Sequence, residues 1–122
     1  MQQATVSAPE SGAEYLTEER CYILELSNDA GDPAVSIARA RVLPGVTTRL
    51  HRVVNTAERY VLLQGQGEVS IDQAPAETVG PGSVVRIPPG VPQRISNTGR
   101  EDLIFLCICT PRFEWPNYES LE

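Results

Sequence analysis

The sequence predicts a single all-β domain, built as a sandwich or barrel, and three observations lead to that prediction. The chain has 122 residues, which fits one domain with a real hydrophobic core. Its apolar residues fall in short runs rich in Val, Ile, Leu and Tyr, and helix-period patterning is weak throughout. Ten prolines and nine glycines lie between these runs, which is the punctuation of an all-β domain.

Eight strands are expected, and each is separated from the next by turn residues. Pro44-Gly45 separates two of them, and Gly65-Gln66-Gly67 allows the positive φ that a tight hairpin needs. No helix follows Gly67, so this Gly-x-Gly is a hairpin and not a phosphate loop. One short helix is expected over 14–20. The expected strands cover residues 21–26, 35–42, 47–53, 59–63, 68–71, 83–87, 93–96 and 103–109.

The domain organisation follows from these elements. Residues 1–12 are expected to form a flexible arm, residues 13–110 the barrel domain, and residues 111–122 an irregular tail. Aromatic side chains in the tail could pack back on the barrel or on a second subunit. These side chains are Phe113, Trp115 and Tyr118.

Composition excludes several classes of function. The formal charge is −6, from 10 basic and 16 acidic residues, which argues against a nucleic-acid partner and an anionic membrane surface. No apolar run approaches the roughly 20 residues that span a bilayer. No secretory signal is visible at the start of the chain, so a cytoplasmic protein is expected.

The three cysteines do not predict a disulfide framework. Their count is odd and no CxxC spacing occurs, so reduced thiols are expected at Cys21, Cys107 and Cys109. Cys107 and Cys109 should share one face of a strand. They are interpreted as small buried apolar side chains, with a soft-metal site as the alternative.

Three polar residues could meet in the interior. His51, the only histidine, lies in the strand expected over 47–53, and Glu58 follows a short loop. In an antiparallel hairpin, residues that flank the loop face each other, so both side chains could point into the same interior. Gln93 opens a later strand after a Pro-rich turn.

The spacing around His51 resembles the first sequence motif of the cupin family. Gly45 is followed by five residues and His51, then Val53, four residues, Glu58, six residues and Gly65. The family motif normally reads Gly, five residues, His-x-His, three or four residues, Glu, six residues, Gly. Val53 therefore stands where the family has its second histidine.

The second cupin motif is similar to a later stretch of the chain. Gly82 is followed by five residues and Pro88, then by Gly90, Gln93 and Asn97 at the family spacing. Gln93 stands where the family normally has a histidine. The resemblance implies an all-β double-stranded β-helix, or jelly-roll, barrel of the cupin type, and a homodimer.

The resemblance also implies a metal site at the family positions. This chain keeps His51 and Glu58, and Gln93 offers only a neutral carbonyl oxygen. These three residues are the expected ligands of a divalent ion (Fe, Mn, Ni or Zn), although the set is thin for a transition metal. The alternative is a metal-free barrel in which the three side chains bond to each other.

Strand alternation adds two residues to the expected pocket. Tyr60 shares an inward face with Glu58, so it could line the pocket or simply pack in the barrel. Arg49 shares a face with His51, so it could clamp an anionic group of a ligand or lie in solvent at the mouth. Arg49, Tyr60 and Gln93 are therefore the predicted ligand-binding residues.

Three functions stay open, because one fold supports many chemistries. The first is an enzyme that holds a divalent metal on His51, Glu58 and Gln93. The second is a metal-free isomerase, cyclase or lyase, in which His51 and Glu58 act as acid and base and Tyr60 or Arg49 orients the substrate. The third is a non-catalytic module that binds a small ligand.

Overall fold

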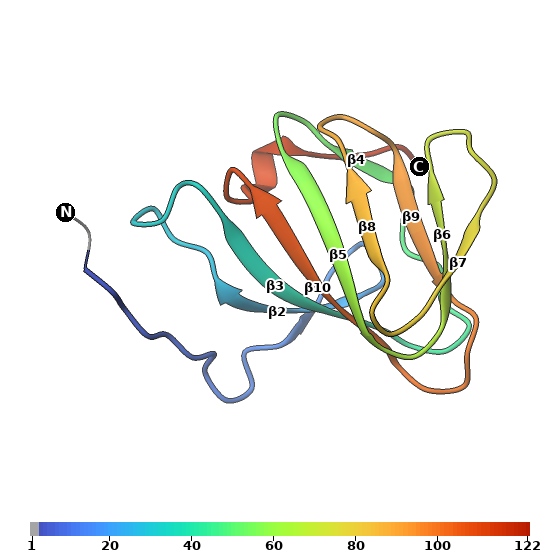
Figure 1. The fold of residues 1–122 in the computed structure, drawn as a ribbon, viewed down its shortest axis with the longest axis horizontal. Helices are drawn as coiled ribbons and strands as arrows, with labels where there is room; N and C mark the ends of the chain where they lie inside the picture. The colour runs from blue at the N-terminus through green and yellow to red at the C-terminus, as the bar shows by residue number, and fades with distance from the viewer. Residues whose placement is uncertain (1–2) are drawn as a thin grey trace.

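The computed structural model describes residues 3–122, which form two antiparallel β-sheets that face each other (Figure 1). All strand pairings within the sheets are antiparallel. The strands are β1 (Tyr15–Leu16), β2 (Tyr22–Ser27), β3 (Ser36–Val42), β4 (His51–Val53), β5 (Ala57–Gln64), β6 (Gly67–Ile71), β7 (Glu77–Val79), β8 (Val84–Ile87), β9 (Gln93–Asn97), β10 (Leu103–Thr110) and β11 (Tyr118–Ser120), with a 3₁₀ turn η1 (Trp115–Asn117) before the last.

The chain passes repeatedly from one sheet to the other, which gives a double-stranded β-helix. One sheet has six strands in the order β1-β2-β3-β10-β5-β8, and the other has five in the order β11-β4-β9-β6-β7. Between β3 and β10, the connections after β3, β4, β5, β7, β8 and β9 each change sheet. The predicted jelly roll is therefore confirmed, although hydrogen bonds do not close the two sheets into one barrel.

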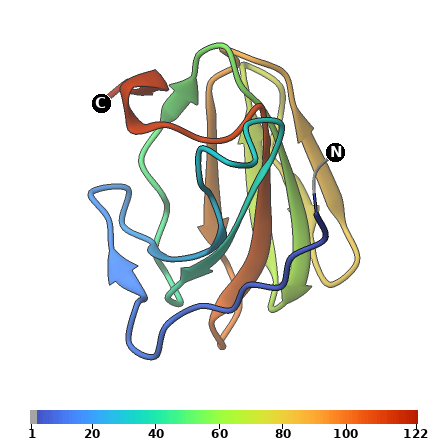
Figure 2. The ribbon, with the colours of Figure 1, turned by 90° about the vertical axis from the view of Figure 1, so that its left-hand side faces the viewer.

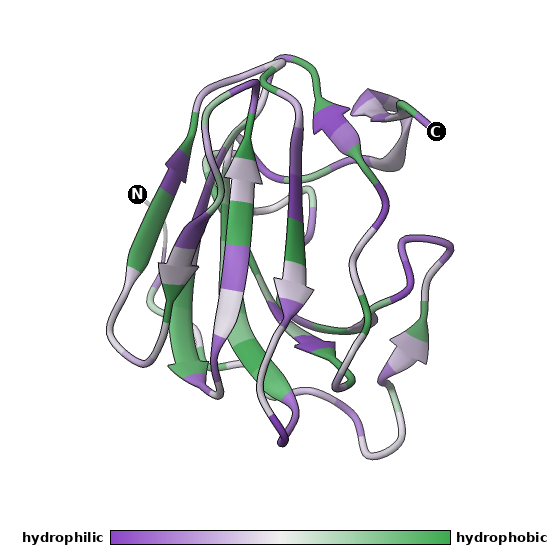
Figure 3. Ribbon diagram, turned by 90° about the vertical axis from the view of Figure 1, so that its right-hand side faces the viewer, coloured by the Kyte–Doolittle hydropathy of each residue, from purple (hydrophilic) through white to green (hydrophobic). Residues whose placement is uncertain are grey.

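The core lies between the two sheets. Val42, Leu62, Ile95 and Leu103 are at most 1% exposed, and they come from β3, β5, β9 and β10. Hydrophobic and hydrophilic residues alternate along several strands (Figure 3), as expected when only one face of each sheet is buried. Because side chains along a strand alternate between the two faces of its sheet, every second residue points into the interior, and the site residues are among these.

The turn between β5 and β6 depends on glycine, but it is not the predicted hairpin, because β5 and β6 lie in different sheets and do not pair. Gly65 has a φ of 86°, which is unfavourable for other residues. A Cβ at Gly65 would lie 2.8 Å from the carbonyl oxygen of Asp102, and one at Gly67 would lie 2.6 Å from that of Ser96. The close approach of neighbouring backbone is therefore a second reason for glycine here.

Two expectations about the chain ends need correction. The helix expected over 14–20 is wrong, because these residues form β1 and turns, and Tyr15 and Leu16 pair with β2. The tail is not wholly irregular, because β11 pairs with β4. Residues 3–12 form no strand and run outside the sheets, with a turn at residues 11–12 (Figures 1 and 2), and residues 1–2 of the predicted arm lie outside the described residues.

No helix among residues 3–122 has the length and apolarity needed to cross a membrane.

Candidate active site

His51 and Glu58 line one cavity between the sheets, but they reach it from opposite sides. The expected hairpin pairing is wrong: β4 pairs with β9 and β11 in one sheet, whereas β5 pairs with β10 and β8 in the other. The two side chains are 3% and 5% exposed. The loop between the strands turns the chain from one sheet to the other, so the residues at its ends face each other across the interior.

The cavity has an apolar mouth and a polar floor. Aromatic side chains of Tyr15, Phe113 and Trp115 line the mouth, and the cavity measures about 60 Å³. It adjoins a deeper space of about 40 Å³ that Tyr60 helps to line. A larger surface hollow of about 680 Å³ contains none of the predicted site residues. The polar side chains that line the rest of the cavity are Glu19, Glu25, Ser36, His51, Glu58, Cys107 and Cys109.

Contacts on both nitrogens fix the imidazole of His51. Nδ1 lies 2.7 Å from the carbonyl oxygen of Arg49, which can only accept, so Nδ1 donates its proton. Nε2 lies 3.3 Å from Oε1 of Glu19. The ring also stacks on Tyr118, with centroids 5.0 Å apart and planes 24° from parallel. Since Nδ1 holds its own hydrogen, Nε2 and Glu19 are placed to share a further proton.

Glu19 is a site residue that the sequence did not reveal. It lies in the segment predicted to be helical, and no motif marks it. The backbone N–H of Arg49 donates to the carbonyl oxygen of Glu19 over 3.0 Å, which holds this turn against the chain leading into β4. Burial raises the pKa of the Glu19 carboxyl, the nearby Glu58 raises it further, and His51 opposes the shift.

Gln93 connects Glu58 to Tyr60. Its amide nitrogen donates to Oε1 of Glu58 over 2.5 Å, and its carbonyl oxygen accepts a hydrogen bond from the Tyr60 hydroxyl. Gln93 is fully buried, so these bonds satisfy groups that water cannot reach. Burial, and then the charge of Glu58, raise the pKa of Tyr60, so its phenol stays protonated.

Arg49 directs its guanidinium away from the cavity. Nε donates to the carbonyl oxygen of Glu18 over 3.2 Å, and one terminal nitrogen lies 3.5 Å from the hydroxyl of Ser120. Among the described residues that line the cavity and the deeper space, none is an arginine, whereas Glu19, Glu25 and Glu58 all are lining residues. The cavity therefore favours neutral or cationic ligands over anions.

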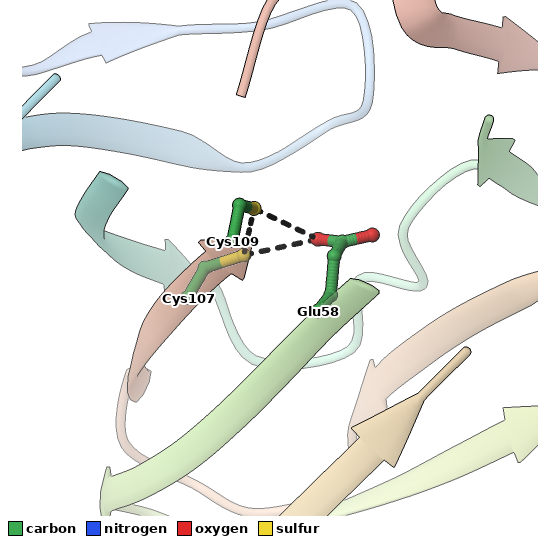
Figure 4. A group of neighbouring side chains, drawn as sticks. All are labelled: Glu58, Cys107 and Cys109. Atoms are coloured by element: carbon green, nitrogen blue, oxygen red, sulfur yellow. Dashed lines mark hydrogen bonds between the residues drawn. The ribbon is translucent and has the colours of Figure 1, made fainter. Parts of the chain in front are cut away.

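Two thiols lie beside Glu58 (Figure 4). Oε2 of Glu58 is 3.0 Å from Sγ of Cys107 and 3.9 Å from Sγ of Cys109, and the two sulfurs are 3.8 Å apart. Hydrogen bonding with Cys109, burial and the charge of Glu58 raise the pKa of Cys107. Both cysteines face inward, as their shared parity on one strand predicts.

Comparison with known proteins shows the family. Residues 38–109, more than half of the chain, match the model of the cupin domain, so the chain belongs to the cupin family. The uncharacterized protein MJ1618 of Methanocaldococcus jannaschii is 34% identical over 110 residues, which are 88% of this chain and 87% of that protein.

Solved structures with the same fold include enzymes. Pac13 of Streptomyces, described as a unique nucleoside dehydratase, superposes with a TM-score of 0.78 at 14% identity, over 97% of this chain and 92% of that one. A predicted oxalate decarboxylase from Thermotoga maritima gives a TM-score of 0.71 at 24% identity, over 86% and 93%. At these identities the likeness shows the fold alone.

The family positions do not provide a three-histidine, one-glutamate metal centre. Val53 has no donor atom, and the carbonyl oxygen of Gln93 already accepts from Tyr60. His51 directs its two nitrogens at Arg49 and Glu19. Within residues 3–122, the group of metal-ligating side chains with suitable spacing is instead Glu58, Cys107 and Cys109.

Proposed function

We propose that this cupin is a small-molecule enzyme that transfers protons, with His51 as base and Glu19 as acid. The observation that carries the proposal is the 3.3 Å contact between Nε2 of His51 and Oε1 of Glu19. When the pair shares one proton and Glu19 holds it, Nε2 keeps a free lone pair. A base and an acid then stand side by side at the cavity.

This pair supports elimination of water from a hydroxylated compound. Nε2 of His51 takes a proton from carbon, and the electrons of that C–H bond form the new double bond. The C–O bond breaks, and the leaving hydroxyl takes the proton of Glu19 to become water. The proton on Nε2 then crosses the 3.3 Å contact and restores the starting state. Isomerisation needs the same transfers without loss of the hydroxyl.

The surroundings of the pair favour a neutral or cationic substrate with an apolar part. Three carboxylates line the cavity, while Phe113 and Trp115 provide aromatic surface at its mouth. Tyr60 and Glu58, which are linked by Gln93, would orient polar groups deeper in the site. A dehydratase of the same fold, the Streptomyces Pac13, adds support for an elimination.

The divalent ion, the homodimer and the cytoplasmic location expected from the sequence stay predictions. A divalent ion on His51, Glu58 and Gln93 would require Gln93 to turn its carbonyl oxygen away from Tyr60. A homodimer fits the exposed Leu63 and Val84, which are 49% and 56% exposed. A cytoplasmic location rests on the sequence alone.

Hydrogen exchange from solvent tests the proposal before the substrate is known. The protein would be incubated in D₂O with a panel of small neutral hydroxylated compounds, including uridine, and with phosphorylated counterparts. We expect NMR to show loss of one C–H signal, or a dehydrated product, for a neutral member of the panel. His51→Gln and Glu19→Gln should abolish the exchange, and Glu68→Gln, on the exposed surface, should not.

Two results would count against the proposal. Exchange that survives both His51→Gln and Glu19→Gln would show that another group moves the proton. Saturable binding of panel members without exchange or product would instead identify a non-catalytic binding module.

A further inference from the structure

The cavity also holds a group of metal-ligating side chains, none of which gives or takes a proton in the proposed reaction. Cys107 and Cys109 are two residues apart on β10, so their side chains point to the same side. Glu58 lies on the neighbouring strand β5, where it pairs with Cys109 of β10. Figure 4 shows both sulfurs and one carboxylate oxygen converging from these two strands. Central strands of one sheet therefore hold all three donors.

The spacing of the three donors matches three corners of a tetrahedron around a metal ion. Zinc bonds sulfur at about 2.3 Å and carboxylate oxygen at about 2.1 Å, so tetrahedral angles give about 3.8 Å between sulfurs and about 3.6 Å from sulfur to oxygen. The two sulfurs are 3.8 Å apart. Oε2 of Glu58 lies 3.0 and 3.9 Å from them, which brackets the ideal value.

The chemistry of the donors selects the kind of ion. Thiolates are soft ligands that prefer zinc or similar thiophilic metals to magnesium or calcium. Two thiolates and a carboxylate carry three negative charges, and no arginine lines this cavity among the described residues. A divalent cation would offset most of that charge.

We propose that Cys107, Cys109 and Glu58 form a binding site for a thiophilic divalent ion such as zinc. Binding forms two metal–sulfur bonds and one metal–oxygen bond, and it releases one proton from each thiol without any change of oxidation state. All three residues line the cavity, so the fourth coordination position opens onto it. Three protein ligands and one open position are typical of zinc sites that act on ligands. The inference is independent of the proposed proton transfer, since neither His51 nor Glu19 is a ligand.

Cobalt(II) is the probe for the test, because thiolate ligands give it charge-transfer absorption in the near ultraviolet. Untagged, fully reduced protein would be titrated with Co²⁺ and then with Zn²⁺. We expect the absorption to saturate at one Co²⁺ per chain, with visible bands of tetrahedral cobalt. Added Zn²⁺ should then displace the cobalt and abolish the absorption. Zinc binding should also release protons and raise the Tm of the protein.

Matched serine variants assign the ligands. Cys107→Ser and Cys109→Ser should each weaken or abolish the charge-transfer band, and Cys21→Ser should leave it unchanged, because Cys21 lies outside the group. Glu58→Gln should weaken binding while keeping thiolate absorption. Circular dichroism of each variant shows whether it is folded. The proposal is overturned if folded wild-type protein gives no thiolate band, or if the band survives both Cys107→Ser and Cys109→Ser.

Discussion

Nε2 of His51 lies 3.3 Å from Oε1 of Glu19, and the backbone of one residue holds both partners in place. The carbonyl oxygen of Arg49 accepts from Nδ1 of His51, and the N–H of Arg49 donates to the carbonyl of Glu19. The pair therefore depends on main-chain geometry. Substitution of the Arg49 side chain should disturb it far less than substitution of either partner.

The raised pKa of Glu19 predicts how stability depends on pH. A carboxyl with a raised pKa in the folded state favours folding below its ordinary value of 4.5 and loses that contribution as pH rises through the folded value. Glutamine does not ionise, so Glu19→Gln does not lose stability at this position as pH rises. Measured by urea unfolding, the variant should gain stability relative to wild type as pH rises above 4.5. If the difference in unfolding free energy between wild type and Glu19→Gln did not change with pH, the pKa of the buried Glu19 carboxyl would not be raised.

The same substitution at two tyrosines should have opposite effects. Tyr60 donates a buried hydrogen bond to Gln93, so Tyr60→Phe leaves an unpaired carbonyl oxygen and should cost about 1–3 kcal/mol of unfolding free energy. The hydroxyl of Tyr118 is buried without a hydrogen-bond partner. Tyr118→Phe removes that unpaired group and should stabilise the protein by about 1 kcal/mol. Denaturant unfolding of both variants checks the sign of each change.

Arg41 ties the N-terminal segment to the barrel, and its loss should be costly. Its guanidinium bonds to Glu14 and Asp102 and stacks over the ring of Tyr22. Arg41→Gln should lower the unfolding free energy by about 1–2 kcal/mol, since these charged bonds are partly exposed. Arg39→Gln, which loses a single bond to Glu14, is the matched control and should cost less.

The effect of Arg41→Gln should depend on pH. Hydrogen bonding to Arg41 lowers the pKa of Glu14, so the contribution of this pair is present above pH 4.5 and is lost as pH falls through the folded value. The difference between wild type and variant should therefore shrink in acid. If wild type and Arg41→Gln differed in unfolding free energy by the same amount at pH 7 and at pH 3, Arg41 would act through packing alone.

Trp115 should control access to the cavity. It lines the mouth, is 48% exposed, and packs edge-on against Phe113 and Tyr118. Trp115→Ala should speed the reaction of Cys107 with a thiol reagent while costing little stability. The rate of thiol labelling at fixed pH measures this. An unchanged rate would place the entry to the cavity elsewhere.

The sequence by itself determined most of the fold. Turn glycines such as Gly65 and the period-two runs specify strands locally, so eight strands and the cupin motifs were predictable within a few residues. Inward placement of His51, Glu58 and Cys107 also follows from strand parity. These properties depend on local backbone preferences and on alternation, which a sequence displays directly.

Only the tertiary structure decided which groups meet. Glu19 contacts His51 because a turn from the N-terminal segment packs against the chain leading into β4, and Tyr118 reaches the same imidazole because β11 joins its sheet. Gln93 bonds to Tyr60 and Glu58 across the interior. Such contacts join segments far apart in the chain, and they are set by how the two sheets pack. The spacing of residues along the chain does not show how the two sheets pack, so these contacts could not be predicted from the sequence.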